Sequence, residues 1–156
     1  MDQVRRILDN LRPPTLDALG LVGALRAHAQ NSADGLAVQV SAAGPLLTPL
    51  DPDVEAAAHR IALEALTNVH RHARATRCTV RLATDDSQLF VEIEDDGRGL
   101  PAVPRPGVGL ASMRYRAESL EGALEVRSGS GGTTVTARLP RQRTWPPPRG
   151  PGRAGR

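Results

Sequence analysis

Three short polar segments, in succession along the chain, carry the residues that could do chemistry. The first places Glu64 and Asn68 one helical turn apart, so that a carboxylate and an amide share one face. The second is the acidic glycine loop Asp95-Asp96-Gly97-Arg98-Gly99, and the third is the glycine loop Gly107-Val108-Gly109-Leu110. Each segment alone is weak, because short glycine motifs occur often by chance. Together they predict a pocket for a nucleotide and its magnesium ion.

The side chains of the first segment suit a hard cation and phosphate groups. Magnesium prefers oxygen ligands and keeps several of its waters, so Asn68 could offer its amide oxygen to the ion. Glu64 could hold a water or orient an attacking group as a general base. Arg71 and His72 continue the same polar stripe and could contact phosphate oxygens. On these residues alone, a polar helix face that meets only solvent is an equally good interpretation.

The two glycine loops predict binding sites for a base and for phosphates. Asp95 ends an apolar strand pattern, and a buried carboxylate there needs a donor, which the exocyclic amine of adenine would supply. Gly97 and Gly99 permit positive φ and the close approach of a flat base. Gly107 and Gly109 open a helix whose first N–H groups suit phosphate. Taken alone, an ordinary Asp-Gly turn explains the second loop better.

Two other phosphate-binding motifs are excluded. The third segment lacks the last glycine of the dinucleotide-binding fingerprint and comes too late in the chain for it. A Walker loop requires a lysine, and the chain contains none.

The apolar pattern predicts the elements that would position these segments. Helices are expected over residues 2–11, 15–30, 52–73 and 110–120, and strands over residues 36–40, 78–83, 89–94, 123–128 and 133–139. Asp51 is expected to cap the long helix. Its core stripe is predicted to contain Val54, Ala58, Ile61, Ala65 and Val69. The buried side of the helix at 15–30 is predicted to contain Leu16, Leu19, Val22, Leu25 and Ala29.

Composition indicates one globular domain. The chain has 156 residues, 40% hydrophobic and 24% charged, which is enough for a single core. Neither a membrane-spanning run nor a secretory signal is recognisable, so a cytoplasmic location is expected. Cys78 is the single cysteine and lies in a strand pattern, so we expect a core residue and no disulfide within the chain.

The basic residues are unevenly distributed. Every one of the 20 basic residues is arginine, and five of them lie in residues 141–156, a stretch rich in Pro and Gly that we expect to be a disordered tail. The other fifteen arginines face 17 acidic residues. Nucleic-acid binding by the folded part is therefore not expected.

The segments resemble the ATP-binding catalytic domain of two-component sensor histidine kinases, of the GHKL superfamily with the Bergerat fold. The resemblance implies an α+β fold, a two-layer α/β sandwich in which helices cover one face of a mixed, mostly antiparallel sheet. It also implies that Glu64 and Asn68 are the catalytic residues, that Asn68 binds magnesium while Glu64 reaches the ion through water, and that Asp95 contacts the adenine amine. Residues 100–106 would be the ATP lid. The other ATP-binding residues would be Arg71, His72, Gly97, Gly99, Gly107, Val108, Gly109, Leu110 and Thr133.

The same resemblance divides the chain into three parts. Residues 1–14 would be the end of a dimerisation helix and its junction, residues 15–140 the ATPase domain, and residues 141–156 the tail. The junction at residues 11–21 and the short lid resemble kinases that serve LuxR-type response regulators. Full-length relatives of this kind include membrane-anchored proteins, although this chain is expected to contain no span.

The family's phosphoacceptor histidine is not recognisable in this chain. None of the four histidines, His28, His59, His70 and His72, has the expected context, and the first three are expected at the surface. The leading hypothesis is therefore transfer of the γ-phosphoryl group of ATP to a histidine of a separate dimerisation domain, serving indirectly a LuxR-type regulator. The alternatives are a GHKL serine kinase that binds a sigma factor and a nucleotide-binding regulatory module without phosphoryl transfer.

Overall fold

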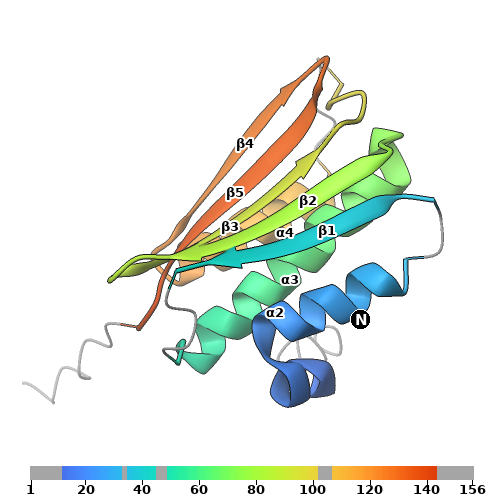
Figure 1. The fold of residues 1–156 in the computed structure, drawn as a ribbon. Coiled ribbons are helices and arrows are strands. Elements are labelled where there is room, and N and C mark those ends of the chain that lie inside the picture. The colour runs from blue at the N-terminus through green and yellow to red at the C-terminus, as the bar shows by residue number, and fades with distance from the viewer. Residues whose placement is uncertain (1–11, 33–34, 45–48, 102–106, 144–156) are drawn as a thin grey trace, which may run out of the picture.

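The computed structural model describes residues 12–32, 35–44, 49–101 and 107–143. It is a two-layer α+β sandwich in which one face of a five-stranded sheet is covered by helices, as predicted (Figure 1). The helices are α2 (Pro14–Gln30), α3 (Pro52–Asn68), the π-helix η1 (Val69–Ala73) and α4 (Val108–Ser119). The strands are β1 (Ala37–Ala43), β2 (Arg77–Thr84), β3 (Gln88–Asp95), β4 (Ala123–Gly129) and β5 (Gly132–Pro140). The helix expected at residues 2–11 lies outside the described residues.

The sheet has the strand order β1-β2-β3-β5-β4, and only the β1–β2 pair is parallel. The predicted alternation is confirmed, since Val80, Val91 and Ile93 are buried while Arg81 and Glu94 face away from the helices. The register pairs Cys78 with Asp95, so Asp95 closes β3 directly beside the start of β2. A carboxylate is thereby fixed at the end of a buried strand.

The long helix forms for the reasons read from its sequence. Asp51 accepts a hydrogen bond from the Asp53 N–H at 2.9 Å, which caps the helix, and Pro52 occupies its first turn. All five residues of the predicted core stripe are buried. Beyond Asn68 the helix continues to Ala73 as a π-helix, which ends where Arg74 adopts a left-handed conformation with φ of 50°. The wider π turns change the direction of every side chain after Asn68.

The prediction for the buried side of α2 is wrong at Leu19. This side chain is 53% exposed, while its neighbour Leu21 is buried. The reason is Gly20, whose φ of 69° interrupts the helix and rotates the residues before it relative to those after it.

His59 is also placed differently from the prediction. It is only 4% exposed, because α2 packs against α3 and covers the side of α3 that the sequence pattern assigned to solvent. Its Nδ1 atom has no hydrogen-bond partner among the described residues. Burial lowers the pKa of His59, and the nearby charges of His28 and Arg60 lower it further.

The two ends of the described chain are attached to the domain. Arg12 forms ion pairs with Asp17 and Glu55 and donates to the Pro52 carbonyl, which joins the start of α2 to the start of α3. Arg141 was predicted to lie in the tail, but it is buried and donates from its guanidinium to the Asp85 carbonyl at 2.9 Å. The folded part therefore extends at least to residue 143, and residues 144–156 lie outside the described residues.

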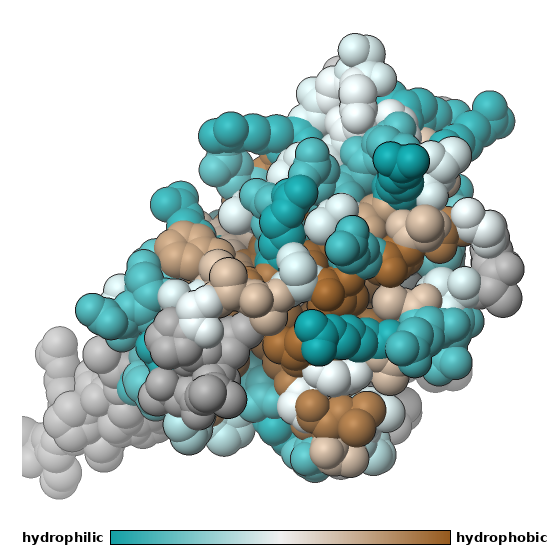
Figure 2. Space-filling view, in the orientation of Figure 1, coloured by the Kyte–Doolittle hydropathy of each residue, from teal (hydrophilic) through white to brown (hydrophobic). Residues whose placement is uncertain are grey.

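Hydrophilic residues cover most of the visible surface, with a hydrophobic area near the middle of the face shown (Figure 2). Of the large hydrophobic side chains described, Leu19, Leu100 and Tyr115 are the exposed ones. Among the residues described, no helix combines the length and apolar character that crossing a bilayer requires.

Candidate functional site

The first and third polar segments meet where α3 passes the start of α4. We call this place the helix end, and it consists of Glu64, Asn68 and Gly109. A Cβ atom on Gly109 would lie 2.5 Å from Glu64 Oε1 and 3.3 Å from Asn68 Nδ2, so the ends of these two side chains occupy the space beside the α4 backbone. Two oxygen-bearing side chains one turn apart are thus brought against the backbone of a helix N-terminus. This arrangement of the two segments was predicted.

The second polar segment lies where β3 ends beside the start of β5. We call this place the strand end, and it consists of Asp95, Gly97, Gly132 and Thr133. Asp95 is 7% exposed, and its Oδ1 accepts hydrogen bonds from the backbone N–H of Gly97 at 2.8 Å and of Thr133 at 3.4 Å. No donor among the described residues reaches Oδ2. One carboxylate oxygen is therefore held by the protein, while the other keeps its acceptor capacity.

The acidic glycine loop is attached to the end of the π-helix. A Cβ on Gly97 would lie 2.3 Å from the carbonyl oxygen of Ala73, so this position has no room for a side chain. Arg98 donates two hydrogen bonds to the same turn. Its backbone N–H donates to the Ala73 carbonyl at 2.8 Å, and its Nε donates to the His72 carbonyl at 2.8 Å. The sequence pattern did not single out Arg98, because an arginine between two glycines has no periodic signal of its own.

Gly99 and the turn between β4 and β5 form the next contact of this loop. Gly99 has a φ of 77°, and a Cβ there would lie 2.2 Å from the Gly129 carbonyl oxygen. Ser128 Oγ accepts from the Leu100 N–H at 2.6 Å and lies 3.0 Å from Thr133 Oγ1. The predicted residues Gly99 and Thr133 are thus neighbours in space, and Ser128 is a connecting residue that the sequence analysis missed.

Asp96 has a structural role that its neighbour Asp95 does not share. Its carboxylate accepts from the Thr76 N–H at 2.8 Å, the Thr76 hydroxyl at 2.7 Å and the Arg77 N–H at 2.9 Å. These donors, the Arg77 N–H foremost, lower the pKa of Asp96. Asp96 therefore fixes the start of β2, while no such set of donors binds Asp95 Oδ2.

The remaining predicted site residues fall into two groups. Arg71 and His72 have exposed side chains, and among the described residues neither forms a hydrogen bond or ion pair with Glu64 or Asn68. Gly107 is the N-cap residue of α4, followed by Val108 at its first position, and Leu110 is half-buried against the core. Of the predicted lid, residues 102–106 lie outside the described residues.

A cavity of about 190 Å³ adjoins the helix end. It is lined by Arg60, Leu63, Glu64, Thr67 and Arg116, of which only Glu64 was predicted as a site residue. The spacing of the four residues from α3 places them on one helical face, and this signal was present in the sequence. Arg116 comes from α4, and only the packing of the two helices could reveal it.

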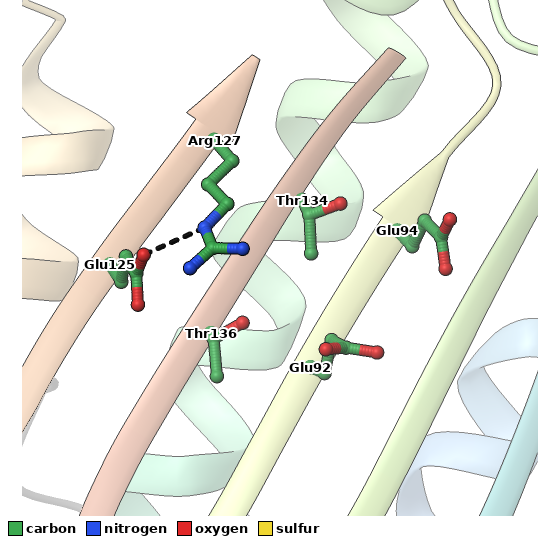
Figure 3. A pocket seen from close by; sticks show the side chains of 6 residues that line it. All are labelled: Glu92, Glu94, Glu125, Arg127, Thr134 and Thr136. Carbon is green, nitrogen blue, oxygen red and sulfur yellow. Dashed lines mark hydrogen bonds and ion pairs between the residues drawn. The ribbon is translucent and has the colours of Figure 1, made fainter. Parts of the chain in front are cut away.

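A larger hollow of about 350 Å³ lies on the opposite, open face of the sheet (Figure 3). Its lining consists of Glu92, Glu94, Glu125, Arg127, Thr134 and Thr136. The charged groups already have partners, since Arg127 binds Glu125 at 2.7 Å and Arg81 binds both Glu92 and Glu94 at 2.7 Å. No residue of the three polar segments lines this hollow. We therefore assign the candidate site to the helix-covered face of the sheet.

The donor set of the helix end fits magnesium that arrives with a nucleotide. Among the described residues, no three His, Cys, Asp or Glu side chains are grouped to hold a metal. Magnesium in nucleotide sites uses one or two protein oxygens and takes its other ligands from phosphates and water. Asn68 Oδ1 and the Glu64 carboxylate, both beside Gly109, supply such oxygens.

Cys78 is buried in the core and is the residue of β2 that pairs with Asp95 of β3. Burial raises the pKa of its thiol to about 12, and the negative charge of Asp95 acts in the same direction. A thiol that stays protonated is a poor nucleophile and metal ligand. The predicted core role is confirmed.

Comparison with known proteins shows the family to which the chain belongs. Residues 53–143 match the family model described as histidine kinase-, DNA gyrase B-, and HSP90-like ATPase, and this range contains the helix end and the strand end. The chain is 34% identical to the sensor histidine kinase MctS of Rhizobium johnstonii, over 92% of this chain and 32% of that protein. It is 33% identical to the sensor histidine kinase LiaS of Bacillus subtilis, over 89% of this chain and 39% of that protein. The chain thus spans about a third of the length of these relatives.

A solved structure shares the fold. The blue-light activated histidine kinase of Erythrobacter litoralis EL346 superposes with a TM-score of 0.64 at 26% identity, covering 78% of this chain and 42% of that one.

Proposed function

The chain belongs to the histidine kinase-, DNA gyrase B-, and HSP90-like ATPase family, and from this membership we propose that it binds magnesium-ATP across the strand end and the helix end. The observation that carries the proposal is that the two carboxylate oxygens of Asp95 differ in their hydrogen-bond donors. Two backbone N–H groups hold Oδ1, while no described donor reaches Oδ2. Oδ2 is not among the buried atoms of the described residues that lack a partner, so it is open to a donor from a ligand. The exocyclic amine of adenine is such a donor.

The glycines of the strand end would shape the seat of the base. Gly97 and Gly99 keep side chains away from the loop that follows Asp95, and Thr133 adds a hydroxyl beside it. The backbone of this loop can then come close to a flat ring.

The helix end would receive the phosphates. Asn68 would bind the magnesium ion, and Glu64 would hold one of its waters or orient the attacking group. Magnesium, when bound, neutralises phosphate charge and draws electron density from the reacting phosphorus. The first N–H groups of α4, at Gly107, Val108, Gly109 and Leu110, would face the phosphates, and Arg71 and His72 would approach them from η1.

In the proposed reaction the chain is the catalytic part of a sensor histidine kinase in two-component signal transduction. A nitrogen of an acceptor imidazole, on a separate dimerisation domain, attacks the γ-phosphorus of ATP. The bond from that phosphorus to the β,γ-bridging oxygen breaks, ADP leaves, and the phosphohistidine then serves a response regulator of the LuxR type. Catalysis would rest on positioning and charge. The reaction is placed in the cytoplasm, where ATP is available.

The binding half of the proposal is tested by equilibrium titration with magnesium-ATP. Asp95→Asn keeps an oxygen for the Gly97 and Thr133 N–H groups but turns an amide donor toward the adenine amine, so we expect about 10- to 100-fold weaker binding. Asn68→Asp places a second carboxylate one turn from Glu64, so repulsion of the phosphates should weaken binding similarly. Parent-like affinity in both variants would disprove the pocket assignment.

The transfer half needs an acceptor. The chain is incubated with radiolabelled ATP, magnesium and a separately produced dimerisation domain of a sensor histidine kinase. We expect label on the acceptor that is lost in acid and stable in alkali, as a phosphoramidate is, and no phosphohistidine on the chain alone. Acid-stable label would indicate phosphoserine and support the serine-kinase alternative, while binding without any transfer would support a regulatory module.

A further inference from the structure

The π-helix η1 ends against the acidic glycine loop, and one residue of that loop binds its last two carbonyl groups. The backbone N–H of Arg98 donates to the Ala73 carbonyl at 2.8 Å, and the Nε of Arg98 donates to the His72 carbonyl at 2.8 Å. The last carbonyls of a helix have no partner within the helix, and the helix dipole favours a cationic donor at that end. Arg98, which lies 26 residues after His72, therefore caps η1 from a distant part of the chain.

The same loop is attached to Asp95. The Gly97 N–H donates to Asp95 Oδ1 at 2.8 Å. Gly97 also lies so close to η1 that an added Cβ would come within 2.3 Å of the Ala73 carbonyl oxygen. A short run of adjacent residues therefore joins the carboxylate that is proposed to bind adenine to the end of η1.

The side chains of η1 depend on what holds its end. A π-helix of five residues gains little from its own hydrogen bonds, because short helices are marginal and π turns are rare outside functional sites. Arg71 and His72 lie within η1, and both side chains are exposed. A change from π to α turns would alter the direction in which these two side chains point, because the two helices differ in residues per turn.

We propose that Arg98 is a positioning residue that keeps η1 in its π form and so directs Arg71 and His72 toward the phosphates of a nucleotide bound at the strand end. The role of these two side chains rests on the proposed function. The hydrogen bond from Nε is the contact that matters, because it reaches the backbone of His72 itself. In this role Arg98 acts through η1 and does not contact the nucleotide.

The structural half is tested in the chain without nucleotide by hydrogen exchange. Arg98→Gln keeps an N–H donor at the position of Nε, because both nitrogens are bonded to Cδ, while Arg98→Met places a methyl group at the same distance along the side chain. Both variants lose the charge and keep the backbone N–H. We expect the N–H groups of η1 to exchange about threefold or more faster in Arg98→Met and at the parent rate in Arg98→Gln. Parent-like exchange in Arg98→Met would show that Nε does not hold η1, and the proposal would be rejected.

The functional half is tested by calorimetric titration with magnesium-ATP and with adenosine. Arg98→Met should weaken magnesium-ATP binding about three- to tenfold and leave adenosine binding unchanged, because the loop at the strand end keeps its backbone contacts. Arg98→Gln should bind both ligands as the parent does. Equal losses in the two variants would show that the guanidinium charge acts directly on the phosphates. Equal losses of magnesium-ATP and adenosine would show a general effect on the base site, and either result would overturn the positioning role.

A double-mutant cycle connects Arg98 to the side chains that it is proposed to direct. In the Arg71→Met/His72→Ala background, Arg98→Met should have no further effect on magnesium-ATP affinity, because the positioned groups are gone while the His72 carbonyl remains. An undiminished effect there would also overturn the proposal. If the parent chain does not bind magnesium-ATP, the proposed function fails, while hydrogen exchange still decides whether Arg98 holds η1.

Discussion

The strand end and the helix end both depend on glycine, but the atoms that exclude a side chain differ. At the strand end, a Cβ on Gly132 would lie 1.8 Å from the Asp95 carbonyl oxygen, and one on Gly97 would lie 2.3 Å from that of Ala73. At the helix end, the atoms nearest to a Cβ on Gly109 belong to the side chains of Glu64 and Asn68. A strand carbonyl cannot move without its ladder, whereas a long side chain can rotate.

In the proposed nucleotide pocket, this difference would separate a rigid half from an adjustable one. A nucleotide base is a rigid ring, so a binding site made of backbone atoms suits it. A triphosphate changes its charge and its metal ligands during transfer, and side chains that rotate can follow that change. Glycine substitutions at the strand end should therefore act on folding, and a glycine substitution at the helix end on ligand binding.

The largest effect is expected for Gly132→Ala. Its φ of 125° is unfavourable for any residue with a Cβ, and the added atom meets the Asp95 carbonyl, so we expect a loss of at least about 3 kcal/mol of unfolding free energy. The measurement is urea unfolding followed by circular dichroism. Gly131→Ala, where no atom lies within 4 Å of the added Cβ, should change stability by less than about 0.5 kcal/mol. Similar values for both variants would contradict a rigid strand end.

A smaller loss of folding stability is expected for Gly97→Ala. The new methyl group must push the Ala73 carbonyl, which already accepts from the Arg98 N–H, so we expect a cost of about 2 kcal/mol. Hydrogen exchange at Arg98 should become faster in the same variant. Gly129→Ala is the control, since its Cβ would meet open space. Unchanged exchange at Arg98 would show that the loop does not depend on this contact.

Gly109→Ala should show the opposite pattern. Glu64 and Asn68 can rotate away from the methyl group, so stability should stay within about 0.5 kcal/mol of the parent. The displaced side chains should weaken magnesium-ATP binding about tenfold, or about 1.4 kcal/mol. Adenosine, which has no phosphates, should bind with unchanged affinity in calorimetric titrations. A strong loss of stability would place the helix end in the rigid class.

The smallest expected effects are in pH dependence, where His59 in the helix layer and Asp96 at the start of β2 should respond in different ranges. The pKa of His59 is lowered from its ordinary value of 6.5, chiefly by burial. The stability that the folded chain gains from keeping His59 neutral is therefore complete above about pH 6.5 and is lost as the pH falls through the lowered pKa. The pKa of Asp96 is lowered from 3.8 by its backbone and hydroxyl donors, so its contribution is present above pH 3.8 and lost only below it.

Unfolding midpoints measured across both ranges check this separation. His59→Leu should flatten the dependence between about pH 7 and about pH 5, and Asp96→Asn should flatten it only below about pH 4. If Asp96→Asn altered the upper range, the two regions would not be independent.

The elements that carry the three polar segments could be predicted because their signals are local. The stripe of the long helix, the capping by Asp51 and the order of the three polar segments depend on spacing within single elements. The fold class followed from the same patterns and from the resemblance to a known family.

What the sequence could not predict depends on contacts between elements. His59 was assigned to solvent because no pattern within α3 indicates that α2 covers it. Leu19 was assigned to the core because a continuous helical period was extended through Gly20. Arg116 was missed because its relation to Glu64 exists only once α4 lies against α3.

Cys78 gives the chain a practical property. It is the single cysteine among 156 residues, it is buried, and its thiol has a pKa of about 12. Reagents that attack thiolates at neutral pH should therefore leave the parent chain unlabelled. A cysteine introduced at the open position of Gly131 would then be the one reactive thiol, and a fluorophore there would report nucleotide binding beside the strand end without any change to the native sequence elsewhere.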